Sequence, residues 1–313
     1  MESSTAIAYS SSANLGPGYD VLAVAHGAYH DRVTASFSSQ DFHGQVKIIA
    51  DGLPVDPVKN TAGLSVLELF KEKKITDSIT LSIEKGVPTG LGLGSSGASA
   101  SAAISAVDDL LNLELSDDEK VKYAMLGEMA SSGTAHADNV AASIYGGLVL
   151  VESISPMKIR RIKFSHDFSF ITVIPELFIE GKTKLLRQMV PRQVGIESYV
   201  QGVRFVTSLV AGLISGDRDL VKSGMNDDII EVARKPVYPF YDTVKQSILS
   251  RDAVGVCISG AGPSILAVVD NKTDIEGIKS DSKRIFAEYG YNCSIVSSKL
   301  AGGVTAQESS TVN

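Results

Sequence analysis

The pattern of apolar and polar residues along the chain changes repeatedly between the two-residue period of a strand and the longer period of a helix. Residues 78–84 alternate strictly, which indicates a strand, whereas residues 62–73 place Leu64, Leu67 and Phe70 on one face of a helix. The same reasoning predicts strands over residues 4–10, 32–50, 78–84, 148–153, 168–175, 254–259, 264–269 and 291–297, with loops over 11–18 and 260–263. It predicts helices over residues 62–73, 98–111, 119–131, 196–215, 217–234, 239–249 and 274–288.

The order of these elements predicts the fold class. Strands and helices mix without a strict strand–helix–strand repeat, so we expect an α+β fold rather than a doubly wound parallel sheet. The Ile-Ser-Pro sequence within residues 153–158 indicates a linker, which divides the chain into an N-terminal domain of residues 1–155 and a C-terminal α+β domain of residues 156–303. The polar residues 304–313 are expected to form a disordered tail.

The overall composition narrows the classes of partner. The chain has 313 residues, 44% of them hydrophobic, and a formal net charge of −7, so it can bury a large core but offers no basic stripe for nucleic acid. Its two cysteines, Cys257 and Cys293, lie in apolar surroundings and are interpreted as small core residues. It contains no basic-then-apolar leader and no apolar run of about eighteen residues. We therefore expect a soluble cytoplasmic protein without a nucleic-acid or membrane partner.

One segment, residues 88–100, carries the most specific chemistry. It reads Pro-Thr-Gly-Leu-Gly-Leu-Gly-Ser-Ser-Gly-Ala-Ser-Ala and connects the predicted strand 78–84 to the predicted helix 98–111. Glycines allow the backbone to approach an anion, and the unpaired N–H groups and dipole of a helix N-terminus favour negative charge there. The segment therefore predicts a phosphate site rather than an ordinary turn.

This segment departs from two familiar phosphate loops. A Walker-type loop needs a lysine, and none lies between Lys85 and the predicted helix. Residues 92–97 match Gly-x-Gly-x-x-Gly, but the next twenty residues stay helical, whereas a nicotinamide site needs a second strand that ends in an acid. The adjacent hydroxyls of Ser95 and Ser96 suit phosphate oxygens and Mg²⁺, which a lysine-free loop needs to offset triphosphate charge. A nicotinamide dehydrogenase is the weaker alternative.

Two polar clusters flank apolar segments elsewhere in the N-terminal half. Asn14 and Asp20 enclose a rigid Gly-Pro-Gly turn, which is either a capped turn or a binding loop. Glu128 precedes a glycine-broken helix end and the sequence His-Ala-Asp-Asn at residues 136–139. No further histidine or cysteine at ligand spacing supports a zinc site there.

The C-terminal half adds two more candidates. Arg187 and Arg234, if they face the same ligand, would form a bidentate clamp for a carboxylate. The small residues of Ser-Gly-Ala-Gly-Pro-Ser at 259–264 permit close approach of the backbone to a ligand, or merely a tight connection between two strands.

Three of these segments resemble, in order, the motifs of the GHMP small-molecule kinases. They are residues 12–20 (Ser-Ala-Asn-Leu-Gly-Pro-Gly-Tyr-Asp), 90–96 (Gly-Leu-Gly-Leu-Gly-Ser-Ser) and 258–264 (Ile-Ser-Gly-Ala-Gly-Pro-Ser). Within the family, Asn-Leu-Gly-Pro-Gly-x-Asp, Ser-Gly-x-x-His-x-Asp-Asn and Lys-Thr-x-x-x-Arg are similar to the branch that phosphorylates L-homoserine. The resemblance implies the GHMP kinase fold, two α+β domains with the active site in the cleft between them. It also implies phosphate transfer from ATP to the homoserine hydroxyl on the route to threonine, with Mg²⁺ as cofactor, and the homodimer common in the family.

The resemblance further implies a role for each matching residue. It places adenosine near Asn60 and Lys85 and the triphosphate on residues 92–96. The whole nucleotide set is Asn60, Lys85, Pro88, Gly90, Leu91, Gly92, Leu93, Gly94, Ser95 and Ser96. It places Mg²⁺ on Ser96 and Glu128 and the amino acid on Asn14, Asp20, His136, Asn139, Arg187 and Arg234. Thr183 lies beside the reacting phosphate and forms the catalytic set with Arg187 and Glu128.

The charges of the acceptor residues support this substrate independently. Homoserine is a zwitterion, so its site needs an anion for the ammonium and a cation for the carboxylate, which Asp20 and the two arginines supply. A mevalonate site would need only the cation. The acceptor of the hydroxyl proton stays open between Asp138, a phosphate oxygen and water. The remaining alternatives are a GHMP kinase for mevalonate or a sugar, and an ATP-binding regulatory module without catalysis.

Two positions depart from the family pattern. Tyr19 stands where phenylalanine is common, and Gly97 stands where alanine is common. A glycine there weakens the first turn of the helix by roughly 0.5–1 kcal/mol. Neither departure changes the interpretation.

Overall fold

The computed structural model describes residues 3–38, 46–133 and 135–307, and of Ser131, Ser132, Thr183, Lys184 and Gln307 it describes the backbone alone. Within these residues the strands form two sheets. The seven-stranded sheet has the order β11–β1–β2–β4–β3, with β5 paired to β2 and β6 paired to β5. Its strands are β1 (Ser3–Asn14), β2 (Gly18–Phe37), β3 (Val46–Ala50), β4 (Ile79–Glu84), β5 (Leu148–Ile154), β6 (Met157–Ile162) and β11 (Thr305–Gln307).

The second sheet has four strands in the order β10–β7–β9–β8 and is antiparallel throughout. Its strands are β7 (Ser169–Pro175), β8 (Gly255–Ile258), β9 (Ile265–Val269) and β10 (Cys293–Ser298). The helices of the N-terminal half are α1 (Thr61–Lys73), α2 (Ser95–Leu111), α3 (Asp117–Gly127), α4 (Met129–Ser132) and α5 (Asp138–Tyr145). Those of the C-terminal half are α6 (Lys182–Gln188), α7 (Ile196–Ser215), α8 (Arg218–Gly224), α9 (Ile230–Arg234), the 3₁₀ turn η1 (Lys235–Val237), α10 (Tyr241–Ser250) and α11 (Ile275–Glu288).

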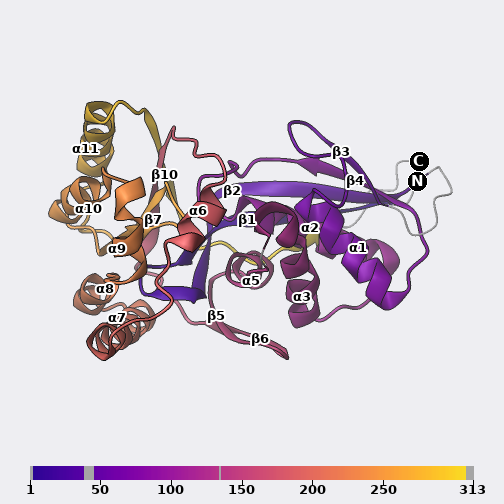
Figure 1. Ribbon diagram of the computed structural model, residues 1–313, viewed down its shortest axis with the longest axis horizontal. Helices are drawn as coiled ribbons and strands as arrows, with labels where there is room; N and C mark the ends of the chain where they lie inside the picture. The colour runs from indigo at the N-terminus through magenta and orange to yellow at the C-terminus, as the bar shows by residue number, and fades with distance from the viewer. Residues whose placement is uncertain (1–2, 39–45, 134, 308–313) are drawn as a thin grey trace.

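Helix α2 is the centre of the N-terminal half. Three of its small residues, Ala98, Ala100 and Ala102, are completely buried, which lets the helix lie close against β1 and β2. Helices α1, α3 and α5 pack around it (Figure 1). Because α2 is held on all sides, the loop that enters its N-terminus is held in place as well.

The two halves share one apolar cluster. Leu22 and Val24 of β2 and Leu148 of β5 pack with residues of the second sheet, including Phe170 and Leu266. The long hairpin of β1 and β2 therefore runs from the helices at the right of Figure 1 into the second layer at the left. The predicted fold class, α+β in two domains, is confirmed.

Several predicted boundaries differ from the structure. The linker predicted over 153–158 is the turn of a hairpin between β5 and β6, whose pairing continues the first sheet to Ile162. Short polar turns and linkers share the same composition, so the sequence did not distinguish them. The predicted tail includes β11, which pairs with β1, while residues 308–313 lie outside the described residues.

The serine-rich loop predicted over residues 11–18 is mostly strand. Strand β1 continues to Asn14 and β2 begins at Gly18, because the buried hydroxyls of Ser10 and Ser12 have hydrogen-bond partners in His26. The strand predicted over 32–50 is two strands, β2 and β3.

Two helices predicted from the sequence are each divided into two shorter helices in the structure, and an acidic residue lies at or near each division. The helix predicted over 119–131 ends at Gly127, and Glu128 separates α3 from α4. The helix predicted over 217–234 divides into α8 and α9, because the carboxylate of Asp227 accepts the N–H groups of residues 229–231 and starts a new helix. Helices α5 and α6 and strand β6 were missed. No helix among the described residues is long and apolar enough to cross a membrane.

Candidate active site

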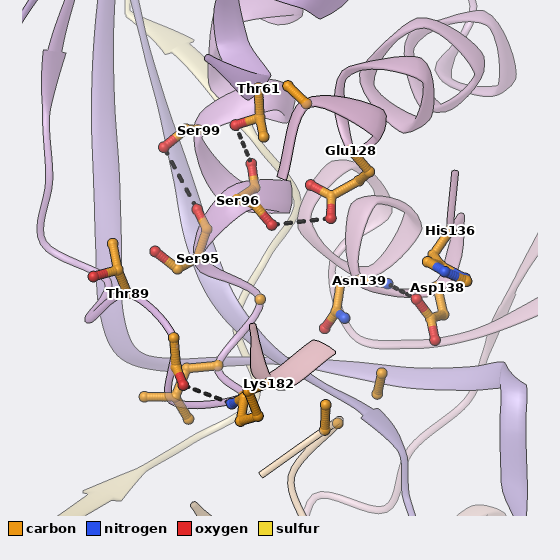
Figure 2. Close-up of a pocket in the computed structure, with 18 of the residues that line it drawn as sticks. Thr61, Thr89, Ser95, Ser96, Ser99, Glu128, His136, Asp138, Asn139 and Lys182 are labelled. Carbon is orange, nitrogen blue, oxygen red and sulfur yellow. Dashed lines mark hydrogen bonds between the residues drawn. The ribbon is translucent and has the colours of Figure 1, made fainter. Parts of the chain in front are cut away.

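A cavity of about 490 Å³ lies where the three motifs meet (Figure 2). Its wall comes from the end of β1, the loop before α2, the region around Glu128 and α5, the start of α6, and the loop after β8. The predicted residues that line it are Asn14, Asp20, Asn60, Lys85, Gly90, Gly92, Leu93, Gly94, Ser95, Ser96, Glu128, His136, Asn139, Arg187 and Arg234. The structure therefore brings together segments that are far apart in the sequence.

The loop before α2 is fixed by close backbone packing. Gly92 has φ +81°, and a Cβ there would lie 2.3 Å from the carbonyl oxygen of Ser259. Gly94, the N-cap of α2, has φ +67°, and a Cβ there would lie 2.1 Å from the hydroxyl of Ser11. Only glycine fits these two positions, so the backbone itself forms this wall of the cavity.

The N-terminus of α2 opens toward the cavity. Its N-cap is Gly94, which has no side chain to cap the first turn, and no acidic residue lies in that turn. The positive end of the helix dipole is therefore not neutralised by the helix itself, and it can bind an anion.

Ser96 and Glu128 form the pair expected to hold Mg²⁺. The Ser96 hydroxyl donates to Oε2 of Glu128 at 2.9 Å (Figure 2). Burial raises the pKa of Glu128 to about 7, a shift that the Ser96 hydrogen bond opposes. One carboxylate and one hydroxyl beside a phosphate loop fit Mg²⁺, which takes few protein carboxylates and completes its shell with substrate phosphates and water. The described residues contain no cluster of three metal-ligating side chains that would hold a metal alone.

Lys85, which is expected near the adenosine, also contacts β2 and the first turn of α2. Its ammonium is paired with Asp31, which is completely buried, and it also donates to the Ser95 carbonyl at 2.8 Å and to the Ser99 hydroxyl at 3.0 Å. Asp31 in turn accepts from the backbone N–H of Val87 at 2.9 Å. Lys85 therefore fastens the first turn of α2 to β2, although it also lines the cavity.

Asn60 and Leu91 also have structural roles. The Asn60 side chain caps α1 by accepting from the N–H groups of Ala62 and Gly63, at 3.0 and 3.2 Å, and it lines the cavity. Pro88 and Leu91 are not among the residues that line the described cavity. The carbonyl of Leu91 instead accepts from the backbone of Ser264 at 3.3 Å, which joins the loop to the second half.

The acceptor side of the cavity is built from charged side chains. Arg187 on α6 donates to Nδ1 of His136 at 2.8 Å and to the Asp20 carboxylate at 3.4 and 3.5 Å. Because Nδ1 accepts that bond, the imidazole is neutral, and burial and the nearby guanidinium lower its pKa. Asn14 holds the backbone N–H of Asp20 through its Oδ1 at 3.2 Å and donates to the Gly260 carbonyl at 3.0 Å.

The aromatic ring of Tyr19 lies close to the guanidinium groups of two arginines. The guanidinium of Arg234 lies 5.4 Å from the centre of the Tyr19 ring, and that of Arg187 lies 5.9 Å from it. Arg234 is buried and donates to the Gly260 carbonyl at 3.1 Å. The departure from phenylalanine at Tyr19 thus keeps an aromatic face between the two cations predicted to form a carboxylate clamp.

Sequence reasoning did not assign Lys182 or Ser259. Lys182 begins α6, lines the cavity and donates to the carbonyl oxygens of Gly90 and Gly262. Ser259 donates to the Gly92 carbonyl at 2.6 Å, and its hydroxyl lies 2.7 Å from that of Ser12. Asp138, which had been considered only as a proton acceptor, is buried and lines the cavity. The side chain of Thr183 lies outside the described part of the chain.

Comparison with known proteins identifies the family to which the chain belongs. The model of the GHMP kinases N terminal domain matches residues 60–147, and that of the GHMP kinases C terminal domain matches residues 209–286. The chain belongs to the GHMP kinase family.

Similar proteins within the family carry one name. The chain is 46% identical over 305 residues to the homoserine kinase of Thermoplasma acidophilum, with 97% of each covered. It is 46% identical over 296 residues to the homoserine kinase of Sulfurisphaera tokodaii, with 95% of this chain and 96% of that protein covered. The solved structure of homoserine kinase from Cytophaga hutchinsonii is similar with a TM-score of 0.88 and 32% identity over 98% of each chain.

Proposed function

We propose that the protein is an ATP-dependent kinase that phosphorylates the side-chain hydroxyl of L-homoserine and produces O-phospho-L-homoserine for threonine biosynthesis. The observation that carries the proposal is the meeting of two unlike sites in one cavity. The uncapped N-terminus of α2 suits a phosphate chain, while Asp20 and the two arginines offer both charges that an amino acid requires. The names of relatives at 46% identity over nearly the whole chain support the same activity.

The nucleotide would bind with its phosphates against the backbone of residues 92–96 and the first turn of α2. Ser96 and Glu128 would hold Mg²⁺, which, when bound, neutralises charge on the phosphate oxygens. Phosphoryl transfer depends mainly on positioning and charge stabilisation, with the attacking and leaving oxygens in line. Thr183 and Arg187, both on α6, would act at the transferred group.

The acceptor would bind at the other end of the cavity. Asp20 would hold the ammonium, Arg187 and Arg234 the carboxylate, and Asn14, His136 and Asn139 would orient the chain that carries the hydroxyl. For this binding the contact of Arg187 with Asp20, at 3.4 Å, would open so that the ligand lies between the two charges.

The proton of the hydroxyl can pass to Asp138, to a phosphate oxygen or to water. Burial raises the pKa of Asp138 to about 6, so its carboxylate is ionised at neutral pH and more basic than usual. A phosphate oxygen can accept the proton instead without any base. Asp138→Asn separates the first from the other two: a loss of about 100-fold or more in kcat with an unchanged KM for homoserine indicates a base. A smaller change assigns the proton to the phosphate or to water.

The experiment that tests the function is a coupled ADP-release assay with Mg²⁺-ATP. It compares L-homoserine with mevalonate, galactose and L-threonine. Fast turnover on homoserine alone supports the proposal, whereas turnover on mevalonate or galactose supports the alternative GHMP kinase. Tight ATP binding without turnover on any acceptor would indicate the regulatory module.

We infer that two copies of the chain form a homodimer, which the resemblance to the GHMP kinases implies. The support is the apolar face of α7, on which Ile196, Tyr199 and Val203 are exposed by 66%, 58% and 43%. Light scattering on the eluting protein measures its mass. A dimer that becomes a monomer in Val203→Glu agrees with this face, and a monomeric unaltered protein contradicts it.

A further inference from the structure

The phosphate loop has no cation of its own. No lysine or arginine occurs between Lys85 and Lys120, a stretch that contains the whole loop and all of α2. Lys85, which precedes the loop, has its charge matched by the buried carboxylate of Asp31. A nucleotide triphosphate bound at this loop would therefore need positive charge from another part of the chain.

Lys182 reaches the loop from the opposite half of the molecule. It is the first residue of α6, its side chain is buried, and its ammonium donates to the carbonyl of Gly90 at 2.5 Å and to the carbonyl of Gly262. Figure 2 shows its side chain at the edge of the cavity, beside the loop and across from Asn139. An ammonium has three N–H donors, so one remains after these two carbonyl contacts.

The charge of Lys182 is not paired with an acid in the part of the chain that the structure describes. Among the described residues no carboxylate lies within 4.0 Å of its nitrogen, unlike the ammonium of Lys85. Burial, and repulsion by the guanidinium of Arg234, lower the pKa of Lys182 to about 7. A buried cation in this position is stabilised by an anion that enters the cavity.

We propose that Lys182 binds the terminal phosphate of the nucleotide and supplies from α6 the positive charge that the phosphate loop lacks. The inference rests on the proposed function. The terminal phosphate is chosen because Lys182 adjoins Thr183, the residue expected beside the reacting phosphate, and contacts Gly90 at the far end of the loop from the α2 N-terminus. The two carbonyl contacts hold the ammonium at the boundary between the halves, where the phosphate would be transferred.

The competing explanation is that Lys182 has only a structural role and holds together the loops that carry Gly90 and Gly262. A structural contact of this kind affects the shape of the whole nucleotide site, so its loss weakens the binding of ATP and of ADP to the same extent. A phosphate ligand contributes to the nucleotide that has the terminal phosphate and much less to the one that lacks it. The two roles therefore differ in the ratio of the affinities for ATP and ADP.

Calorimetric titration of the full chain with ATP and with ADP, both with Mg²⁺, measures that ratio. We expect Lys182→Met to weaken ATP binding by about 10- to 100-fold and ADP binding by less than about threefold. Lys182→Arg keeps the charge and should recover most of the ATP affinity. Lys235→Met is the matched control, because Lys235 lies on η1 in an exposed ion pair with Asp242 and its loss should leave both affinities unchanged.

Each other outcome overturns the inference. If Lys182→Met weakens the binding of ATP and of ADP equally, Lys182 has only a structural role. If neither affinity changes, Lys182 has no role in nucleotide binding. If the methionine variant shows no cooperative melting transition, Lys182→Gln, whose amide can still donate to one of the two carbonyls, carries the same comparison. Absence of nucleotide binding in the unaltered protein would overturn the proposed function as well, whereas homoserine kinase activity with an unchanged ratio would overturn this inference alone.

Discussion

The two ends of the cavity recognise charge by different means. At the nucleotide end, backbone atoms of a glycine loop and a helix N-terminus form the surface, and Gly92 and Gly94 leave no room for a side chain. At the acceptor end, charged side chains form the surface, and Arg187 of α6 contacts the carboxylate of Asp20 of β2 at 3.4 and 3.5 Å.

The difference indicates how each end contributes to function. The nucleotide end is closely packed, since a Cβ on Gly92 would lie 2.3 Å from the Ser259 carbonyl oxygen and the Ser259 hydroxyl donates to the Gly92 carbonyl at 2.6 Å. The acceptor end can rearrange, because its ion contacts are long and both partners are more than a third exposed. We therefore expect substitutions at the first end to abolish binding altogether, and substitutions at the second to change affinity for one substrate.

The largest expected effect comes from Gly92→Ala. The new Cβ would lie 2.3 Å from the Ser259 carbonyl, a backbone atom that cannot rotate away. We expect a stability loss above about 3 kcal/mol and a fall in ATP affinity of more than about 100-fold. Gly290→Ala is a matched control with the same φ of +81° and nothing within 4 Å of its Cβ, so it should cost only about 1–2 kcal/mol. Equal effects of the two changes in denaturant unfolding would contradict the packing argument.

Glu128→Gln is the next largest. It preserves shape but removes the carboxylate of the Ser96 pair, and kcat should fall by about 100-fold with little change in KM for homoserine. An unchanged kcat would exclude Glu128 from the metal site.

The pKa of Glu128 adds a pH dependence. The buried carboxyl is protonated below pH of about 7, so Mg²⁺-ATP affinity should decrease as the pH falls below that value. In the protein without ligands the sign for stability is opposite. The folded state binds the proton more tightly than the unfolded one, so this group's contribution, up to about 3 kcal/mol, is lost as pH rises from about 4.5 to 7. Glu128→Gln should flatten both profiles, measured by calorimetry and by unfolding.

Asp20→Asn tests the acceptor end. Loss of the carboxylate should raise KM for homoserine by about 10- to 100-fold while KM for ATP stays within about twofold. This is the selective loss that distinguishes the two ends. If kcat disappears and KM for homoserine is unchanged, Asp20 does not hold the ammonium.

The smallest effect is expected at Gly97, in the first turn of α2. A Cβ there would lie 3.4 Å from the Val140 nitrogen and 3.5 Å from Asn139, ordinary contact distances. Gly97→Ala should therefore stabilise the protein by about 0.5–1 kcal/mol without affecting ATP binding. Destabilisation in a thermal melt would show that the nucleotide end is packed more tightly than these distances indicate.

The local parts of this protein can be predicted from the chain alone. The glycine loop, the small-residue helix that follows it and the amphipathic helices depend on neighbouring residues, whose spacing is visible in the chain. The ordered motifs also indicated the family, and most of their residues line one cavity. The resemblance placed Lys85 near the adenosine, which stays a prediction, but it did not indicate that Lys85 also pairs with Asp31 and contacts the first turn of α2.

Contacts between distant groups, in contrast, became visible in the folded molecule. Asp31 neutralises Lys85 across 54 positions of the chain, Lys182 reaches Gly262 across 80, and Ser259 reaches Gly92 across 167. Hydrogen bonds and ion pairs depend on distances of a few ångströms, and a single sequence does not encode which long-range pairs come that close. The glycine loop was therefore predictable from its own residues, whereas the charges around it were set by the packing of the two halves.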